Sequence, residues 1–302
     1  MFFKNLSFFR YPASTNAALG QLEERLAEHP LKPVGPLELS SRGFVSPFGR
    51  DEPALVHRVG DCAWLTLGRE DRLLPGAVVN EALAKKLAEI EAKEGRRLGG
   101  KARRQLKEDL VHEMLPKAFV KGSRLSASID ARHGMIAIDA ASKKSAEAFV
   151  SELRHALGSF PAVPVNAEVS VRALMTGWLT GEPLPEGLAL GDECELKDPV
   201  DGGAVVKAQR QELTAEEMVK HLEGGKQVTR LALVLDEQVS FVLGEDLVLR
   251  KFRLLDGAVE SLENTERDSL AAELDARYAL FSAEVHRVFG VLEKALKLSR
   301  VD

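Results

Sequence analysis

Phosphate binding is the first chemistry that the sequence suggests, because Lys and Arg are concentrated in one stretch. Residues 85–124 contain twelve basic and six acidic side chains, a net charge of +6 in a chain whose net charge is −5. The densest part, residues 96–104, has five positive charges and no acid. Such a positive field attracts phosphates, so we expect a polyanion as partner. The alternative is a helical surface whose mixed charges are simply solvated.

Nine basic residues of this stretch are the candidate DNA-binding residues. They are Lys93, Arg96, Arg97, Lys101, Arg103, Arg104, Lys117, Lys121 and Arg124. Lys and Arg contacts to phosphates position a protein on DNA without reading its bases. We therefore expect binding with little sequence preference if DNA is the polyanion.

A second chemistry would need a divalent metal ion. Asp130 and Asp139 flank a predicted β-hairpin that contains His133. Mg²⁺ prefers oxygen ligands, and an ion held by these carboxylates could support phosphodiester cleavage. Asp130 is more simply interpreted as a turn residue that accepts backbone hydrogen bonds. A metal-dependent nuclease or other DNA-processing enzyme is thus the alternative function, while the main interpretation is a non-enzyme with no metal and no cofactor.

Other sequence features also favour a non-enzymatic protein. The chain has no phosphate-binding Gly-x-x-x-x-Gly-Lys-Ser/Thr loop, no His-Glu-x-x-His motif and no dinucleotide fingerprint. Its two cysteines, Cys62 and Cys194, are far apart, which predicts neither a disulfide framework nor a zinc knuckle and favours a reducing cytoplasm. No apolar run approaches the roughly 20 residues of a membrane span, so we expect no membrane association.

Phe119 is a candidate contact residue, because it lies between basic residues rather than in an apolar run. An exposed aromatic side chain in such a region is costly unless a partner covers it. Three interpretations remain open, namely core packing, a contact between subunits and a contact with a base.

The basic residues require an element that presents them. Apolar residues at helical spacing predict two helices separated by glycines: Val79, Leu83, Leu87 and Ile90, then Leu106, Leu110 and Met114. Gly95 and Gly99–Gly100 interrupt the pattern between them. The densest charges therefore lie at the bend of a helical hairpin over residues 77–116.

The remaining pattern predicts a mixture of strands and helices. Strands are expected at residues 2–11, 44–45, 62–67, 125–129, 135–140, 193–197, 204–208, 228–235, 239–243 and 247–254. Helices are expected at residues 14–29, 142–158, 174–179 and 214–224 and over a C-terminal region at 261–298. Ser142 and Thr214 are the predicted N-caps, the latter in a capping box with Glu217. A turn is expected at residues 201–203.

These elements predict an α+β fold with mixed or antiparallel sheets in an elongated, multidomain protomer. Pro161 and Pro164 mark the predicted domain boundary. The first domain then spans residues 1–165, including the basic helical hairpin, and the second spans residues 166–302, including the helical region.

Several short motifs together resemble the recombination-associated protein RdgC family. They occur in order at residues 3–6 (FKNL), 73–75 (LLP), 113–119 (EMLPKAF), 158–164 (GSFPAVP), 201–208 (DGGAVVKA), 211–217 (QELTAEE) and 225–233 (GKQVTRLAL). The resemblance covers nearly the whole chain, and its specificity comes from the motifs jointly.

The resemblance implies a bacterial nucleoid protein that binds DNA and restrains the strand-exchange recombinase. It also implies a homodimer closed into a ring, with a positively charged hole for duplex DNA; single-stranded DNA is a second candidate ligand. A ring with two-fold symmetry needs two self-complementary contacts. We expect one at Phe119 and the other at Arg210 and Gln211, within the polar segment 207–211. The alternative is that this segment extends the phosphate-binding surface.

Overall fold

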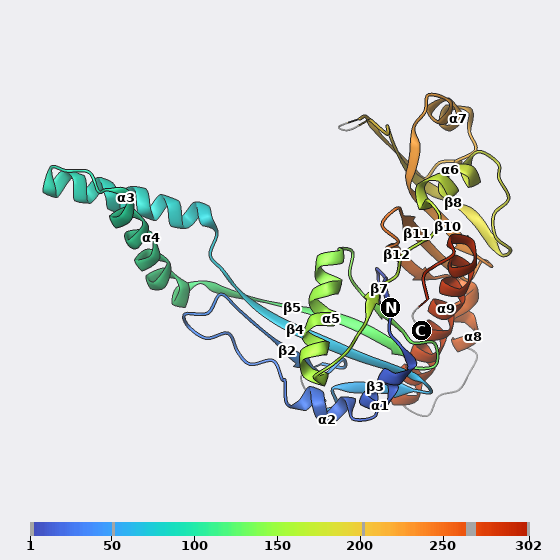
Figure 1. Cartoon of the computed structure of the whole chain (residues 1–302), viewed down its shortest axis with the longest axis horizontal. Coiled ribbons are helices and arrows are strands. Elements are labelled where there is room, and N and C mark those ends of the chain that lie inside the picture. The colour runs from blue at the N-terminus through green and yellow to red at the C-terminus, as the bar shows by residue number, and fades with distance from the viewer. Residues whose placement is uncertain (1–2, 50–51, 201–202, 264–269, 301–302) are drawn as a thin grey trace.

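The fold consists of two antiparallel β-sheets with helices packed on them (Figure 1). The computed structural model describes residues 3–49, 52–200, 203–263 and 270–300. The first sheet contains β1 (Ser7–Arg10), β2 (Ser40–Val45), β3 (Val56–Val59), β4 (Cys62–Leu73), β5 (Phe119–Asp130), β6 (Met135–Ile138) and β7 (Val163–Pro164). The second contains β8 (Leu188–Lys197), β9 (Val205–Gln209), β10 (Gln227–Leu235), β11 (Val239–Gly244) and β12 (Leu249–Leu254). The predicted α+β class with antiparallel sheets is confirmed.

One face of the first sheet is covered by α5 (Lys143–Leu157), with α2 (Leu22–Ala27) beside it. The apolar residues of α5 recur at helical spacing, so Phe149 and Leu153 are fully buried against the sheet. As predicted, Ser142 caps this helix by accepting a hydrogen bond from the Ser145 backbone N–H at 3.2 Å. The helix ends at Gly158, whose φ of 74° is left-handed.

The opposite face of the first sheet is covered by α9 (Leu270–Leu296). Tyr278 of this helix forms a buried hydroxyl–hydroxyl hydrogen bond of 2.7 Å with Ser128 of β5. Phe289 packs on Phe8 of β1, with ring centroids 5.0 Å apart. Phe281 faces the second sheet, where its ring lies 5.9 Å from that of Phe252. The helix therefore belongs to a core that both sheets share.

The predicted domain boundary near residue 165 directly follows a short strand of the first sheet. Strand β7 pairs with β1, and the Val165 backbone N–H donates to the carbonyl of Phe8 at 3.1 Å. The division into two domains stays a prediction.

Strands β4 and β5 form a ribbon that leaves the body of the molecule (Figure 1). They pair over twelve residues, from Cys62 opposite Asp130 to Leu73 opposite Phe119. At the far end of the ribbon lie α3 (Gly76–Glu94), α4 (Gly100–Met114) and a short 3-10 helix, η2 (Leu115–Lys117). Gly95, with a φ of 66°, ends α3. We call residues 68–124 the arm, and the predicted helical hairpin is its outer part.

The structure corrects three predictions of local structure. The predicted helix at 14–29 is divided into η1 (Ala13–Thr15), α1 (Asn16–Leu19) and α2. The predicted capping box is wrong, because α7 (Glu216–Glu223) begins after Ala215 and the Thr214 hydroxyl donates to Glu212 instead. The C-terminal helical region contains α8 (Asp256–Glu263) in addition to α9.

Other predicted elements are found with changed bounds: β2, β5 and β8 begin four to six residues before the predicted strands, β4 ends six residues later, and the helix predicted at 174–179 is α6 (Val171–Leu179). Strand β3 was not predicted. Of the turn predicted at 201–203, residues 201 and 202 lie outside the described residues. Among the described helices, none combines the length and the apolar character that crossing a membrane requires.

Candidate nucleic-acid interface

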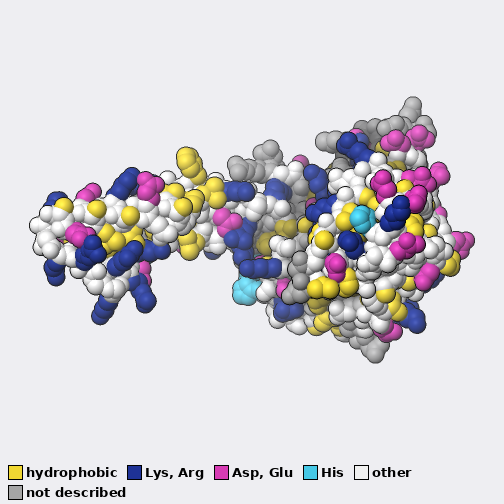
Figure 2. Space-filling view, turned by 90° about the horizontal axis from the view of Figure 1, so that it is seen from above, with side chains coloured by type: hydrophobic (Ala, Val, Ile, Leu, Met, Phe, Trp, Pro, Cys, Tyr) yellow, Lys and Arg dark blue, Asp and Glu magenta, His cyan; other side chains and the backbone are white. Residues whose placement is uncertain are grey.

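The arm presents most of the predicted DNA-binding residues on an exposed surface. Figure 2 shows Lys and Arg side chains projecting along the arm, with Asp and Glu among them. The arm has little apolar interior, since the buried residues of its helical part are Val79, Leu83, Leu110 and Leu115. Its outer surface is therefore available for polar contacts on several sides.

Three of the predicted residues already have acidic partners within the arm. Arg96 lies 3.0 Å from Glu94, and Arg97 lies 2.9 Å from Glu91. Lys117 pairs more loosely with Glu113 at 3.7 Å. These pairs are solvent-exposed, and such ion pairs are worth only about 0–1 kcal/mol. A phosphate would therefore replace the carboxylates at small cost.

Five other predicted residues have no acidic partner within 4 Å in the part of the chain that the structure describes. All five are exposed: Lys93, Lys101, Arg103, Arg104 and Lys121. Lys101 and Arg104 are three residues apart on α4, so their side chains leave the helix on neighbouring positions. The positive charge of this helix is thus not neutralised locally.

Arg124 differs from the other predicted residues. Its guanidinium donates a hydrogen bond to the backbone carbonyl of Ser46, at the end of β2. This contact ties the base of the arm to the body and competes with any contact to phosphate.

Arg72 is a residue of the arm that sequence reasoning missed. Its guanidinium donates to the carbonyls of Gly35 at 3.0 Å and Leu115 at 3.2 Å, with longer contacts to those of Val34, Pro116 and Ala118. One side chain therefore joins the ribbon, the 34–35 loop and the end of the helical hairpin. An isolated Arg at the end of a polar strand gives no sequence signal for this role.

Phe119 is not a core residue, because 84% of its surface is exposed. It lies opposite Leu73 at the outer end of the ribbon. Leu73 and Val120 are also exposed, at 48% and 46%. Phe119 and Leu73 share one face of the ribbon as a small apolar patch, while Val120 lies on the other face, so the two partner-contact interpretations of Phe119 remain.

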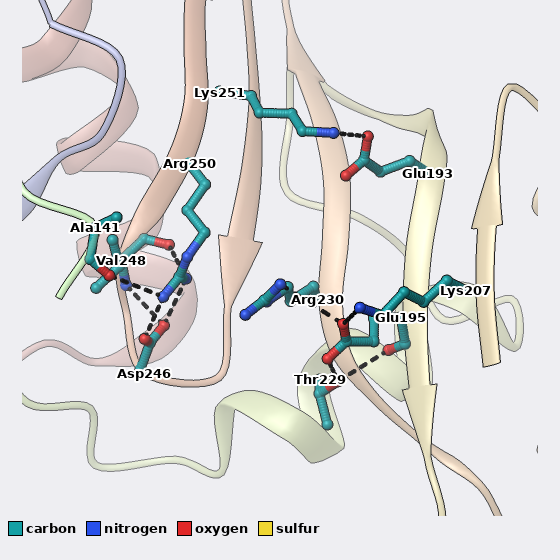
Figure 3. A network of polar contacts seen from close by, with 10 residues as sticks. All are labelled: Ala141, Glu193, Glu195, Lys207, Thr229, Arg230, Asp246, Val248, Arg250 and Lys251. Carbon is teal, nitrogen blue, oxygen red and sulfur yellow. Dashed lines mark hydrogen bonds and ion pairs between the residues drawn. The ribbon is translucent and has the colours of Figure 1, made fainter. Parts of the chain in front are cut away.

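The segment 207–211 lies at the edge of the second sheet. Lys207 forms an ion pair of 3.3 Å with Glu195, which also lies 3.6 Å from Arg230 (Figure 3). Arg210 is exposed and has a φ of 55°. Gln211 is anchored through its backbone N–H, which lies 3.3 Å from the carbonyl of Asp192. Arg210 and Gln211 border a groove over the outer face of this sheet, so both are placed where a partner could contact them.

The proposed metal pair of Asp130 and Asp139 does not form. Asp130 lies opposite Met135 in the β5–β6 hairpin, whereas the Asp139 backbone N–H bonds to Ser126, four residues earlier on β5. Asp139 instead accepts hydrogen bonds from two backbone N–H groups near the N-terminus, at 3.0 and 2.8 Å. The two carboxylates are separated along the sheet, so the prediction of a shared Mg²⁺ site is wrong.

Fold and surface together define the class: an α+β protein with two antiparallel sheets and a projecting, positively charged arm. A family model described as "Putative exonuclease, RdgC" matches residues 1–299. The chain is 62% identical to the recombination-associated protein RdgC of Xanthomonas campestris pv. campestris (strain B100) and 56% identical to that of Stenotrophomonas maltophilia (strain R551-3), over the full length of both chains in each case. It belongs to the RdgC family, as its motifs predicted.

Proposed function

We propose that this protein binds duplex DNA without sequence preference through the arm. The observation that carries the proposal is the group of exposed cations on α4 without acidic partners, above all Lys101, Arg103 and Arg104. When such residues contact phosphates, they release counterions from the DNA, and this release favours binding. Phosphates are the same in every sequence, so the effect does not depend on sequence. The recombination-associated names of the relatives are consistent with a DNA ligand.

We further propose that two protomers close into a ring around the duplex. The arm and the second sheet extend from opposite ends of the first sheet (Figure 1), so the two contacts that a ring requires would lie far apart on each protomer. Phe119 would form one self-complementary contact, and Arg210 with Gln211 the other. Bound in this way on the nucleoid, the protein would restrain the strand-exchange recombinase by occupying its DNA.

The salt dependence of DNA binding tests the central claim. If about five phosphates are neutralised, the logarithm of the affinity falls with the logarithm of the salt concentration with a slope of about −4.5. Replacing both Arg103 and Arg104 by Ala should flatten the slope by up to about 2 and weaken binding to all sequences alike.

A double substitution on the body gives the matched control. Arg25 and Lys32 are exposed cations that have no acidic partner among the described residues. Replacing both by Ala removes the same charge and should leave the slope near that of the parent. Equal slopes for the parent and the Arg103→Ala/Arg104→Ala variant would refute the claim that the arm contacts DNA.

Binding without cleavage is the second part of the proposal, in contrast to the exonuclease description of the family. The separation of Asp130 from Asp139 removes the carboxylate pair that the sequence offered for Mg²⁺. End-labelled duplex incubated with the protein and Mg²⁺ should therefore remain intact. Protein-dependent shortening of that label would instead establish an enzyme.

A further inference from the structure

A group of three potential metal ligands lies at the inner end of β5, away from the arm. Asp130 is buried there, at the start of the β5–β6 turn, and His133 follows within the same turn. His286 comes from α9, on the other side of the contact between the helix and the first sheet. One ligand atom from each of these three residues lies within 4.8 Å of the other two.

The local backbone fixes the carboxylate of Asp130. Its Oδ1 accepts hydrogen bonds from the backbone N–H groups of Arg132 and His133, both at 3.1 Å. Its Oδ2 faces the two rings: it is hydrogen-bonded to Nδ1 of His133 at 2.7 Å and lies 3.8 Å from Nδ1 of His286. Gly134, with a φ of 60°, completes the turn, where a Cβ atom would lie only 2.6 Å from the carbonyl oxygen of Tyr11. The carboxylate is therefore preorganised by its own turn.

The two imidazole rings are stacked against each other, with centroids 3.7 Å apart and planes 23° from parallel. The Nδ1 atom of His286 is buried, and it has no hydrogen-bond partner in the described part of the protein. The side chain of His286 is 45% exposed as a whole, but this nitrogen is turned inward toward Asp130 and is available to a ligand.

We propose that Asp130, His133 and His286 bind one divalent metal ion of the zinc type, which connects the β5–β6 turn to α9. Bonds to such an ion are about 2.0–2.2 Å long, so its ligand atoms lie roughly 3–3.5 Å apart. The side chain of His133 is 38% exposed, which leaves its ring room to turn from the stacked position toward the ion. Two imidazole nitrogens and one carboxylate suit zinc, cobalt or nickel, whereas Mg²⁺ prefers oxygen ligands.

The site is independent of the proposed DNA surface. Asp130 and Phe119 are at opposite ends of β5, eleven residue steps apart, or about 36 Å at 3.3 Å per step. The experiments on metal binding and on DNA binding therefore test separate proposals. Loss of the metal should leave the salt dependence of DNA binding unchanged.

Titration of the full-length protein with Co²⁺, after treatment with a chelator, tests the site. Visible absorption should report saturable binding of one equivalent, and Zn²⁺ should displace the Co²⁺. His286→Ala and His133→Ala should each weaken binding at least about tenfold. In the presence of chelator, both variants should melt at the same temperature as the parent. Added Zn²⁺ should raise the melting temperature of the parent but not that of either variant.

A second histidine pair provides the matched control. His29 and His155 have ring centroids 4.9 Å apart and lie outside the group of ligands around Asp130. The double variant His29→Ala/His155→Ala should bind Co²⁺ as the parent does. The proposal is overturned if no saturable binding occurs, or if this double variant loses as much affinity as His286→Ala.

Discussion

The two ends of strand β5 lie in opposite environments. Its first six residues, Phe119–Arg124, are exposed, while its last four, Ala127–Asp130, are buried between α5 and α9. The pairing with β4 continues unchanged from one end to the other. The backbone therefore supplies a continuous ribbon, and the side chains decide which end is core and which end is available to partners.

Two substitutions on this strand should show the largest contrast. Ile129 is 1% exposed and Val120 is 46% exposed. Ile129→Ala should lower the free energy of unfolding by about 2–5 kcal/mol, because it removes buried methyl groups and leaves a cavity. Val120→Ala should change it by no more than about 0.5 kcal/mol. Denaturant unfolding of both variants measures the difference, and similar losses would mean that the outer end of the strand is packed as well.

Phe119 tests whether the exposed end serves assembly. If it is a subunit contact, burying the ring there contributes roughly 1.5–3 kcal/mol, and Phe119→Ser should shift the dimer toward monomer. The melting temperature of the protomer should stay near that of the parent, because the ring is exposed within the protomer. Solution mass at several concentrations, with melting on the same samples, measures both. An unchanged mass would place the contact between subunits elsewhere.

The smallest expected effect is on the pH dependence of stability, where an ion pair of the body should differ from one on the arm. In the β11–β12 turn, burial alone would raise the pKa of Asp246, but hydrogen bonds from Arg250, at 2.9 and 2.5 Å, hold it below its ordinary value (Figure 3). A pKa lowered by folding contributes stability above the ordinary carboxyl pKa, and that stability is lost as the pH falls through the folded value. Asp246→Asn should thus destabilise by about 1 kcal/mol at pH 7, since the pair is only partly buried and solvent screens it.

The melting temperatures of the parent and the Asp246→Asn variant should begin to approach each other below the ordinary aspartate pKa of about 4 and should meet below the lowered pKa of Asp246. On the arm, a hydrogen bond from Lys85 lowers the pKa of Glu81, but both side chains are fully in solvent. Glu81→Gln is therefore the control and should leave the melting temperature unchanged at every pH. A difference between the Asp246→Asn variant and its parent that persists at low pH would exclude ionisation as the cause.

The sequence predicted the elements whose apolar residues recur at regular spacing and missed strand segments without such a pattern. Helix α5 was predicted with its cap, because its apolar residues and Ser142 give local signals. The outer half of β5 was missed, since Phe119–Arg124 is exposed on both sides and has no apolar alternation. The helical hairpin was predicted, but Arg72, which ties down its base, acts through backbone carbonyls that have no sequence signature.

The sequence brought together only two of the three residues of the candidate metal site. Asp130 and His133 are close in the chain, and the sequence paired them with Asp139, which the hairpin register carries away. His286 lies 156 residues after Asp130 and reaches it only through the packing of α9 on the first sheet. No local pattern predicts such a contact. An isolated histidine on an amphipathic helix is instead typical of a solvated surface.

The packing of α9 also has a consequence for the order in which the chain can fold. The first sheet is built from residues before 165, yet one of its faces is closed by a helix that begins at residue 270. Contacts between segments so far apart carry a high cost in loop-closure entropy and form late. During synthesis, the strands of the first sheet would therefore leave the ribosome long before their cover does. Until the final helix emerges, the apolar residues beneath it remain open to water and to other chains.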